Sequence, residues 1–334
     1  MNADTQKYNI SLFNGSKDFF RQNNHLKNDS FEKIKILNEL KIKANNALLL
    51  DSSAIGNKNL LYYSIFGPSF VFLLELSLKT IAKNCNVNFD LLFITDAPTL
   101  HMLETIDVLN KFNWDYHLVD TPVDGVEASI QKLQVFAYKN IDLYKNILFL
   151  DADVICTKDF TGIFKVNNTS ALEVVVSPLV NRKLEAFPEV IKSAVLSHSL
   201  STFTEENIKF IEKNNPLVFN AGHFYFVNNL QMKEHFNNIL WLKNIWPAVY
   251  FFEQSFMNQY FVLNDLVSYK NLDKIVTVLT VDAYTGSGLF KKQNIELQHN
   301  EHCHALLHFA GATCNGKNKY LYINYYCNKF NICL

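Results

Sequence analysis

Short apolar runs alternate along the chain with longer segments whose apolar residues recur at helical spacing. Four of these runs predict strands, at 60–66, 90–95, 115–119 and 147–150. The segments between them predict helices, at 70–83, 100–112 and 126–144. Strands that alternate with helices favour an α/β fold with a mainly parallel, doubly wound sheet.

The second half of the chain adds further elements around a polar insertion. Its apolar runs predict strands at 172–177, 217–227 and 305–310, and its periodic segments predict helices at 159–164, 230–245 and 250–264. The polar segment 181–215 is predicted to be helical and to act as a lid. Residues 1–58 form a polar extension with an amphipathic helix at 31–42. We therefore expect one large domain over 59–320, followed by a tail at 321–334.

Composition restricts the classes of function. The 334 residues are 49% hydrophobic and 19% charged, which is typical of a globular protein, and the net charge of −1 provides no basic field for nucleic acid. No apolar stretch reaches the ~18 residues of a membrane span; residues 62–78 come closest, but they include Gly67, Pro68 and Glu75. The chain opens MNADTQKYNI, without a basic and then apolar signal segment. We therefore expect a cytoplasmic protein without a membrane span, for which the aromatic content of 14% leaves a homodimer open.

Two aspartates, Asp151 and Asp153, end the fourth predicted strand. Residues i and i+2 of an extended chain point to the same side, so both carboxylates would meet at the carboxyl end of a buried strand. Like charges beside an apolar core need a neutralising cation, and oxygen ligands suit Mg²⁺ or Mn²⁺. Ligands of open α/β sheets bind at this edge. The pair predicts a metal site for a phosphorylated ligand, although a turn or a helix cap would use the same residues.

A second candidate site segment interrupts the predicted strand 217–227 with Asn220, Ala221 and Gly222. A glycine inside a strand usually marks a bulge or the close approach of a ligand. The Asn220 carboxamide offers both a donor and an acceptor, which suits a sugar hydroxyl. A bulge with a capping asparagine is the alternative interpretation.

Two later segments add polar groups. Glu253 and Gln254 begin a predicted helix, where they could reach a cleft or only favour the helix N-terminus. His308 lies near the end of a late strand, where it could complete a carboxylate metal site or be an ordinary core histidine. A lysine behind it could meet a diphosphate as a point charge. A zinc cluster is a further alternative, with the ligands Cys303, His304, His308 and Cys314.

Taken in order, these motifs resemble glycosyltransferase family 8, the glycogenin-like group with the GT-A fold. The resemblance covers residues 60 to 320, and its motifs are Lys132-Leu133, Leu150-Asp151-Ala152-Asp153, Phe219-Asn220-Ala221-Gly222, Glu253-Gln254-x-x-x-Asn258 and His308-Phe309-Ala310-Gly311 with Gly316-Lys317.

The resemblance implies a set of roles. Asp151, Asp153 and His308 would bind Mn²⁺, or alternatively Mg²⁺, which holds the diphosphate of a UDP-sugar. The remaining residues would surround this donor: Phe66 and Gly67 at the nucleotide base, Lys132 and Ala152 facing the donor, Asn220, Ala221 and Gly222 beside its sugar, Glu253 and Gln254 near the reacting carbon, and Gly311 and Lys317 over the diphosphate.

Three departures from the family pattern stand out. The family usually has aspartate where this chain has Glu253. It usually has lysine six residues after the histidine, where this chain has Cys314, which leaves Lys317 or Lys319 as the diphosphate lysine. The extension 1–58 has no counterpart in the small members of the family.

The resemblance implies retaining transfer of a hexose to a hydroxyl group of a glycan, a protein or a small molecule. We favour attack by the acceptor on the face that the diphosphate leaves; a covalent intermediate on Glu253 is the alternative. Two other functions remain open, a nucleotide-sugar-binding protein without catalysis and a metal-dependent phosphohydrolase or nucleotidyltransferase. Acceptor preference is expected to depend on 181–215 and on the C-terminal tail.

Overall fold

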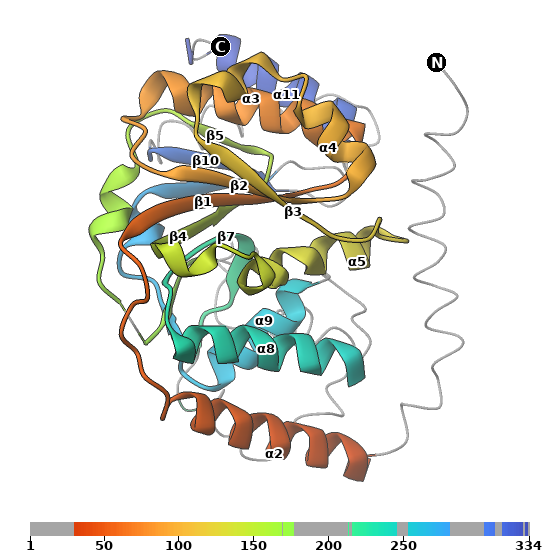
Figure 1. Ribbon diagram of the computed structural model, residues 1–334, viewed down its shortest axis with the longest axis vertical. Coiled ribbons are helices and arrows are strands. Elements are labelled where there is room, and N and C mark those ends of the chain that lie inside the picture. Colours follow the sequence, from red (N-terminus) through yellow and green to blue (C-terminus); the bar gives the residue numbers. More distant parts are fainter. Residues whose placement is uncertain are drawn as a thin grey trace.

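The computed structural model describes residues 30–168, 170–176, 213, 216–245, 253–280, 304–310, 316–329 and 331–332. Within these ranges a seven-stranded sheet lies between two layers of helices (Figure 1). Apart from Lys213, the predicted lid at 181–215 lies outside the described residues, as does Gly311.

The main sheet has the strand order β3-β2-β1-β4-β7-β6-β8. Strands β3, β2, β1 and β4 are parallel to one another, whereas β7 is antiparallel to both of its neighbours. The bounds are β1 Lys58–Ile65, β2 Asp90–Thr95, β3 Trp114–Leu118, β4 Tyr144–Leu150, β6 Leu172–Val176, β7 Phe219–Val227 and β8 Val267–Ser268. The predicted α/β fold with a mainly parallel, doubly wound sheet is confirmed.

A second sheet of three strands has the order β5-β10-β9, with bounds β5 Val154–Cys156, β9 Val276–Thr280 and β10 Leu306–Ala310. Strand β10 is antiparallel to β5 and parallel to β9. The sequence predicted only β10 of these three strands. The small sheet joins the segment that directly follows Asp153 to a segment near the end of the chain.

Alternation along β1 explains why the main sheet is covered on both faces. Leu61, Tyr63 and Ile65 pack into a core that also contains residues of the small sheet. Leu60 and Tyr62 point the other way, into a second core. Successive side chains of a strand project to opposite faces, so one apolar run supplies both cores.

Each core has its own helices. The first is covered by α3 Pro68–Asn84, α4 Ala97–Leu103 and α11 Gly316–Lys329 (Figure 1). The second is covered by α2 Ser30–Ala47, α5 Gly125–Ile130, α8 Leu230–Ile245 and α9 Glu253–Leu263. Short 3₁₀-helices connect these elements, at η2 Asp107–Lys111, η3 Gln131–Ala137, η4 Ile141–Leu143, η5 Thr161–Lys165 and η9 Leu272–Lys274.

The predicted helix at 126–144 is wrong as a single element, because the chain there forms α5, η3 and η4 in turn. Side chains from other elements donate to main-chain carbonyl groups in this segment. Tyr62 donates its hydroxyl proton to the Lys132 carbonyl, and Asn228 donates to the carbonyls of Ile141 and Tyr144. Lys132 lies in the 3₁₀-helix η3. The predicted helix at 100–112 is likewise divided between α4 and η2.

Both ends of the described chain pack on the domain. Helix α2 confirms and lengthens the helix predicted at 31–42, and Lys43 Nζ lies 4.8 Å from the Trp241 ring on α8. Helix α11 lies where the sequence predicted no helix: Ile323, Tyr326 and Cys327 recur at helical spacing and are buried in the first core. It crosses residue 320, where we placed the end of the domain. The domain limits stay predictions.

No helix in the described parts of the chain combines the length and apolarity that crossing a lipid bilayer requires. The expected cytoplasmic location and the homodimer stay predictions.

Candidate metal and donor site

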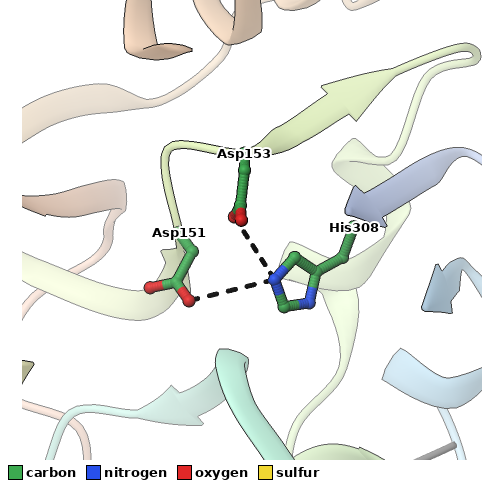
Figure 2. Close-up of side chains that lie close together, drawn as sticks. All are labelled: Asp151, Asp153 and His308. Carbon is green, nitrogen blue, oxygen red and sulfur yellow. Dashed lines mark ion pairs between the residues drawn. The ribbon is translucent and has the colours of Figure 1, made fainter. Parts of the chain in front are cut away.

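Asp151, Asp153 and His308 come together beyond the carboxyl end of β4. Figure 2 shows both carboxylates facing the imidazole ring. His308 Nε2 lies 3.9 Å from Asp151 Oδ2 and 3.3 Å from Asp153 Oδ1. One possible ligand atom from each residue falls within 4.8 Å of the other two. The predicted set of metal ligands is therefore assembled in the structure.

Main-chain hydrogen bonds set this arrangement. Strand β5 begins directly after Asp153, and its pairing with β10 places His308 opposite Val154. The Phe309 amide donates to the Asp153 carbonyl at 3.1 Å, and the Asp151 amide donates to the Gly222 carbonyl at 2.7 Å. Backbone pairing between distant segments thus fixes all three side chains.

The residues at this position fit a divalent cation. Asp153 Oδ1 is buried and accepts no hydrogen bond among the described residues, and its neighbour His308 Nε2 lies 3.3 Å away, on the side of the ring that faces both carboxylates. A buried acceptor without a donor costs about 1–3 kcal/mol, which a bound cation would offset. Two carboxylates and an imidazole are a suitable donor set for such an ion.

Gly222 leaves the space that these ligands need. A Cβ atom at this position would overlap His308 Cε1 and lie 2.7 Å from Asp151 Oδ2. Any other residue type would therefore push the histidine and the aspartate apart. A glycine inside a strand predicted the close approach of another group, and at Gly222 the groups that approach are the side chains of His308 and Asp151.

Lys319 provides a cation from the protein itself. Its Nζ lies 2.5 Å from Asp153 Oδ2, and both side chains are about 10% exposed. Burial raises the pKa of Asp153, but the charges of Lys319 and His308 outweigh burial and hold that pKa well below its usual range. Of the two lysines that the sequence left open, Lys319 is placed at the site. Lys317 lies in the first turn of α11, and its side chain is outside the described parts.

Lys132 connects the metal ligands to α9. Its Nζ donates to Glu253 Oε1 at 2.7 Å, to Asp151 Oδ1 at 3.2 Å and to the Ala221 carbonyl at 3.2 Å. It also lies 4.5 Å from the centroid of the Phe149 ring. Burial lowers the pKa of Lys132, but Asp151 and Glu253 outweigh burial and raise that pKa. The lysine stays charged and neutralises two carboxylates.

The Asn-Ala-Gly segment is a bulge in β7. Its pairing with β6 shifts register, since Glu173 pairs with Tyr225 but Val175 pairs with Asn220. Asn220 Oδ1 accepts a hydrogen bond from the Gly222 amide at 2.8 Å, which closes a local turn. The alternative interpretation of the sequence, a bulge with a capping asparagine, is thus confirmed.

Helix α9 holds the bulge from the other side. Gln254 Oε1 accepts from the Ala221 amide at 3.0 Å, so the Glu253-Gln254 pair does reach the site. Asn258 locks the helix to β7: its Oδ1 accepts from the Phe219 amide at 2.8 Å and its Nδ2 donates to the Phe219 carbonyl at 3.0 Å. One turn of α9 therefore positions both Glu253 and Gln254.

Phe66 and Gly67 follow β1, whose carboxyl end lies beside that of β4 because the two strands are parallel. Gly67 caps α3 at a φ of 82°, which favours glycine, and its amide donates to Thr99 Oγ1 at 2.8 Å. Ala152 is buried between the two aspartates in sequence. Phe66, Gly67 and Ala152 therefore lie near the carboxyl ends of β1 and β4, as Asp151 does. Among the described residues, no hydrogen bond or ion pair joins their side chains to Asp151, Asp153 or His308.

His223 is a residue at this site to which the sequence analysis gave no role. It is fully buried, and neither ring nitrogen has a hydrogen-bond partner among the described residues. Its ring stands at 79° to the His308 ring, with 5.1 Å between centroids. Burial and the charge of His308 hold the pKa of His223 well below its usual range. The sequence offered one signal for this role: His223 is a polar residue within an apolar strand.

The zinc alternative gains no support from the residues that are described. His304 Nδ1 lies 3.0 Å from the Val276 carbonyl oxygen and 2.9 Å from Thr277 Oγ1. His308 faces the two aspartates instead. Cys303 and Cys314 lie outside the described residues.

Comparison with solved structures identifies the fold. The galactosyltransferase LgtC, in complex with donor and acceptor sugar analogues, aligns with a TM-score of 0.50 and 12% identity over 76% of this chain and 87% of LgtC. An active-site mutant of LgtC aligns with the same TM-score and identity over 80% and 95%. The apo form of the glycosyltransferase GlyE of Streptococcus pneumoniae TIGR4 aligns with a TM-score of 0.45 and 14% identity over 83% and 64%. The fold is that of the GT-A glycosyltransferases.

The sequence comparison gives the family. The model of "Glycosyl transferase family 8" matches residues 128–315, which is more than half of the chain. The matched range contains both aspartates and His308. This protein belongs to glycosyltransferase family 8. No curated protein sequence matches the chain significantly.

Proposed function

We propose that this glycosyltransferase is metal-dependent, that its donor is a UDP-sugar, and that it transfers a hexose to a hydroxyl group with retention of configuration. The observation that carries the proposal is the convergence of Asp151, Asp153 and His308, in which the two carboxylates face His308 Nε2 and one possible ligand atom from each residue lies within 4.8 Å of the others. Gly222 is the glycine that makes this convergence possible.

Asp151, Asp153 and His308 would hold the ion, Mn²⁺ or alternatively Mg²⁺. When bound, it would supply Lewis-acid stabilisation of the diphosphate leaving group. Lys319 adds a fixed positive charge 2.5 Å from Asp153 Oδ2, and we propose that it is the diphosphate lysine, in the role first considered for Lys317. Gly311 keeps its proposed place over the diphosphate. Phe66 and Gly67 keep their proposed place at the nucleotide base.

Lys132 and the bulge of β7 would position the donor sugar. Asn220, Ala221 and Gly222 are proposed to line the sugar, with the Asn220 side chain half-buried. The Gln254 carboxamide oxygen already accepts from Ala221, which orients its amide nitrogen as a donor for a sugar hydroxyl. The sugar site would therefore be preorganised by main-chain contacts between β7 and α9.

Glu253 is proposed to position Lys132 near the reacting carbon of the donor sugar rather than to attack that carbon. Its carboxylate is paired with Lys132 at 2.7 Å, so its negative charge is balanced and one of its oxygens is occupied. A carboxylate held in this way is a poor nucleophile. We therefore favour attack by the acceptor hydroxyl on the same face, with the departing phosphate oxygen accepting the proton of that hydroxyl.

The likeness of the fold to LgtC, a galactosyltransferase crystallised with donor and acceptor sugar analogues, supports a sugar or glycan among the possible acceptors. A protein or a small molecule with a free hydroxyl is proposed equally. Residues 181–215 and the C-terminal segment remain the proposed determinants of acceptor preference.

Metal-dependent turnover of a panel of UDP-sugars tests the proposal. UDP release would be followed with Mn²⁺, with Mg²⁺ and with EDTA, each with and without a mixed set of sugar acceptors. We expect release from one donor, stimulated by acceptor and lost with EDTA. Release that chelation does not affect would contradict the metal assignment. Mn²⁺-dependent UDP binding without turnover of any donor would contradict catalysis and favour a nucleotide-sugar-binding protein.

A further inference from the structure

Two cysteine thiols face each other between the end of α3 and the end of β5. Cys85 directly follows α3, Cys156 ends β5, and their Sγ atoms lie 3.2 Å apart. Both thiols are free; Cys156 is fully buried and Cys85 is half-buried. The sequence gave no reason to pair them, because 70 other residues separate them in the chain.

The backbone around the two cysteines is already joined. The Cys156 amide donates to Thr80 Oγ1 at 2.9 Å, and Asn84 Nδ2 donates to the Cys156 carbonyl at 2.9 Å. A disulfide needs sulfur atoms about 2 Å apart, so closing the gap takes a movement of roughly 1 Å. Rotation of two side chains can supply that movement without displacing α3 from β5.

The two thiols differ in reactivity. The hydrogen bond with Cys156 lowers the pKa of Cys85, against the opposing effect of burial. The same contact and burial raise the pKa of Cys156. The thiolate is the nucleophilic form of cysteine, and Cys85 is also the more accessible of the two. Cys85 is therefore the attacking thiol, and Cys156 is the thiol that resolves the intermediate.

We propose that Cys85 and Cys156 form a site of reversible oxidation to an intramolecular disulfide, with glutathione disulfide as the oxidant. The Cys85 thiolate attacks one sulfur of glutathione disulfide and displaces one glutathione thiolate, which takes up the Cys85 proton. Cys156 then attacks the Cys85 sulfur of the mixed disulfide and displaces the second glutathione, which takes up the Cys156 proton. The protein loses two electrons, and one glutathione disulfide becomes two glutathione molecules.

This disulfide would join α3 to the strand that follows a metal ligand. Cys156 pairs with Leu306 across the ladder in which Val154 pairs with His308. Oxidation would link the Cys156 end of that ladder to α3. Asp153 and His308 lie at the opposite end of the ladder and would not be cross-linked. The expected effect is a gain in stability, because the cross-link constrains the unfolded chain across a long loop.

The test uses the full chain, reduced and then incubated with glutathione disulfide, with peptide mapping and thermal unfolding as readouts. We expect a mass lower by two hydrogens, a linked peptide pair containing Cys85 and Cys156, and a melting temperature higher by roughly 5 °C. Added dithiothreitol should reverse all three changes.

Variants separate the two steps. Cys156→Ala should stop at a glutathione adduct on Cys85, whereas Cys85→Ser should leave Cys156 unmodified. Cys327→Ala is the matched control, because Cys327 is buried on α11 and burial raises its pKa to about 12; it should behave like the parent protein. A link that joins either cysteine to a different one, a stable adduct on Cys85 in the parent protein, or an unchanged melting temperature would overturn the proposal.

Discussion

Lys132 and Glu253 form an ion pair inside the protein, with 2.7 Å between Lys132 Nζ and Glu253 Oε1. The two side chains are 5% and 8% exposed, and they come from η3 and α9 on the same side of the main sheet. Because Lys132 also contacts Asp151, one ammonium group joins the proposed sugar site to the proposed metal site. Replacing Lys132 or Glu253 should therefore lower the stability of the fold and weaken binding of the donor.

Replacing Lys132 by methionine tests the stability of this pair. Lys132→Met would leave two carboxylates without their shared cation, and we expect it to lower the free energy of unfolding by about 3–5 kcal/mol. The double variant Lys132→Met with Glu253→Gln should recover part of that loss. Urea denaturation measures both values.

An exposed pair provides the control for that experiment. Lys79 Nζ lies 2.8 Å from Glu75 Oε1 on the surface of α3, and Lys79→Met should cost about 0.5 kcal/mol or less. Equal losses for Lys79→Met and Lys132→Met would contradict a buried and tightly coupled pair.

Metal binding should depend on Asp153 but not on Asp159, an aspartate outside the proposed metal site. Asp153→Asn keeps the size of the side chain but removes the charge that the ion needs, so we expect Mn²⁺ affinity to fall by more than about 100-fold. His308→Ala should give a similar loss. Isothermal titration calorimetry with Mn²⁺ alone measures these affinities without any assay of activity.

Asp159 is the matched control. It is exposed on the same segment, and its Oδ1 accepts a hydrogen bond from the Thr161 amide at 2.9 Å, outside the cluster of metal ligands. Asp159→Asn should keep the Mn²⁺ affinity of the parent protein. Unchanged Mn²⁺ affinity in Asp153→Asn would remove Asp153 from the metal site.

A methyl group at residue 222 should damage the site while sparing the fold. In Gly222→Ala the new Cβ would overlap the His308 ring and crowd Asp151, so we expect Mn²⁺ affinity and UDP release to fall by at least about tenfold. Gly162→Ala is the control, since a Cβ there meets nothing within 4 Å. Circular dichroism checks folding, and wild-type metal affinity in Gly222→Ala would refute the close packing.

Acidification should destabilise the protein through buried histidines. Burial lowers the pKa of His235 to about 4, whereas an unfolded histidine titrates near 6.5. Below pH 6.5 the unfolded state binds a proton that the folded state refuses. Stability from this residue is therefore complete above pH 6.5 and falls as the pH drops toward 4, by up to about 3 kcal/mol.

The variant His235→Gln should make that decline shallower between pH 6.5 and 4 in urea unfolding series. His101→Gln is the control, because the His101 side chain is 88% exposed, and it should leave the profile as it is. An identical decline in the parent protein and in His235→Gln would show that the buried imidazole does not carry the effect.

The sequence predicted the main strands because their apolar runs are long and bounded by polar segments. It missed β5, β8 and β9. Strands β5 and β8 have three and two residues, and runs so short have no readable period, but β9 has five residues and was missed despite its apolar run. It also predicted one helix where α5, η3 and η4 lie. This segment is tied to elements distant in the chain, since Tyr62 donates to the Lys132 carbonyl and Asn228 to the Ile141 carbonyl, and such contacts cannot be read from its periodicity.

For the site, the sequence predicted the two aspartates and His308 but left the lysine open. The contact of Lys319 with Asp153 depends on how α11 packs against α3, and its helical spacing was obscured by the Gly-Lys-Asn segment at its start. His223 was visible only as one more residue of a buried strand. Its ring lies against the His308 ring of β10, a strand distant in the chain. Long-range packing decided each of these features.

The antiparallel pairing of β5 with β10 has a consequence for biosynthesis. Asp153 emerges from the ribosome long before His308, so a growing chain displays two aspartates for as long as it takes to synthesise the intervening half of the protein. The third ligand arrives only when β10 adds to β5. A chain cut anywhere between Asp153 and His308 would keep the aspartate pair yet hold an incomplete set of proposed metal ligands, so the proposed metal site can be complete only when translation is nearly finished.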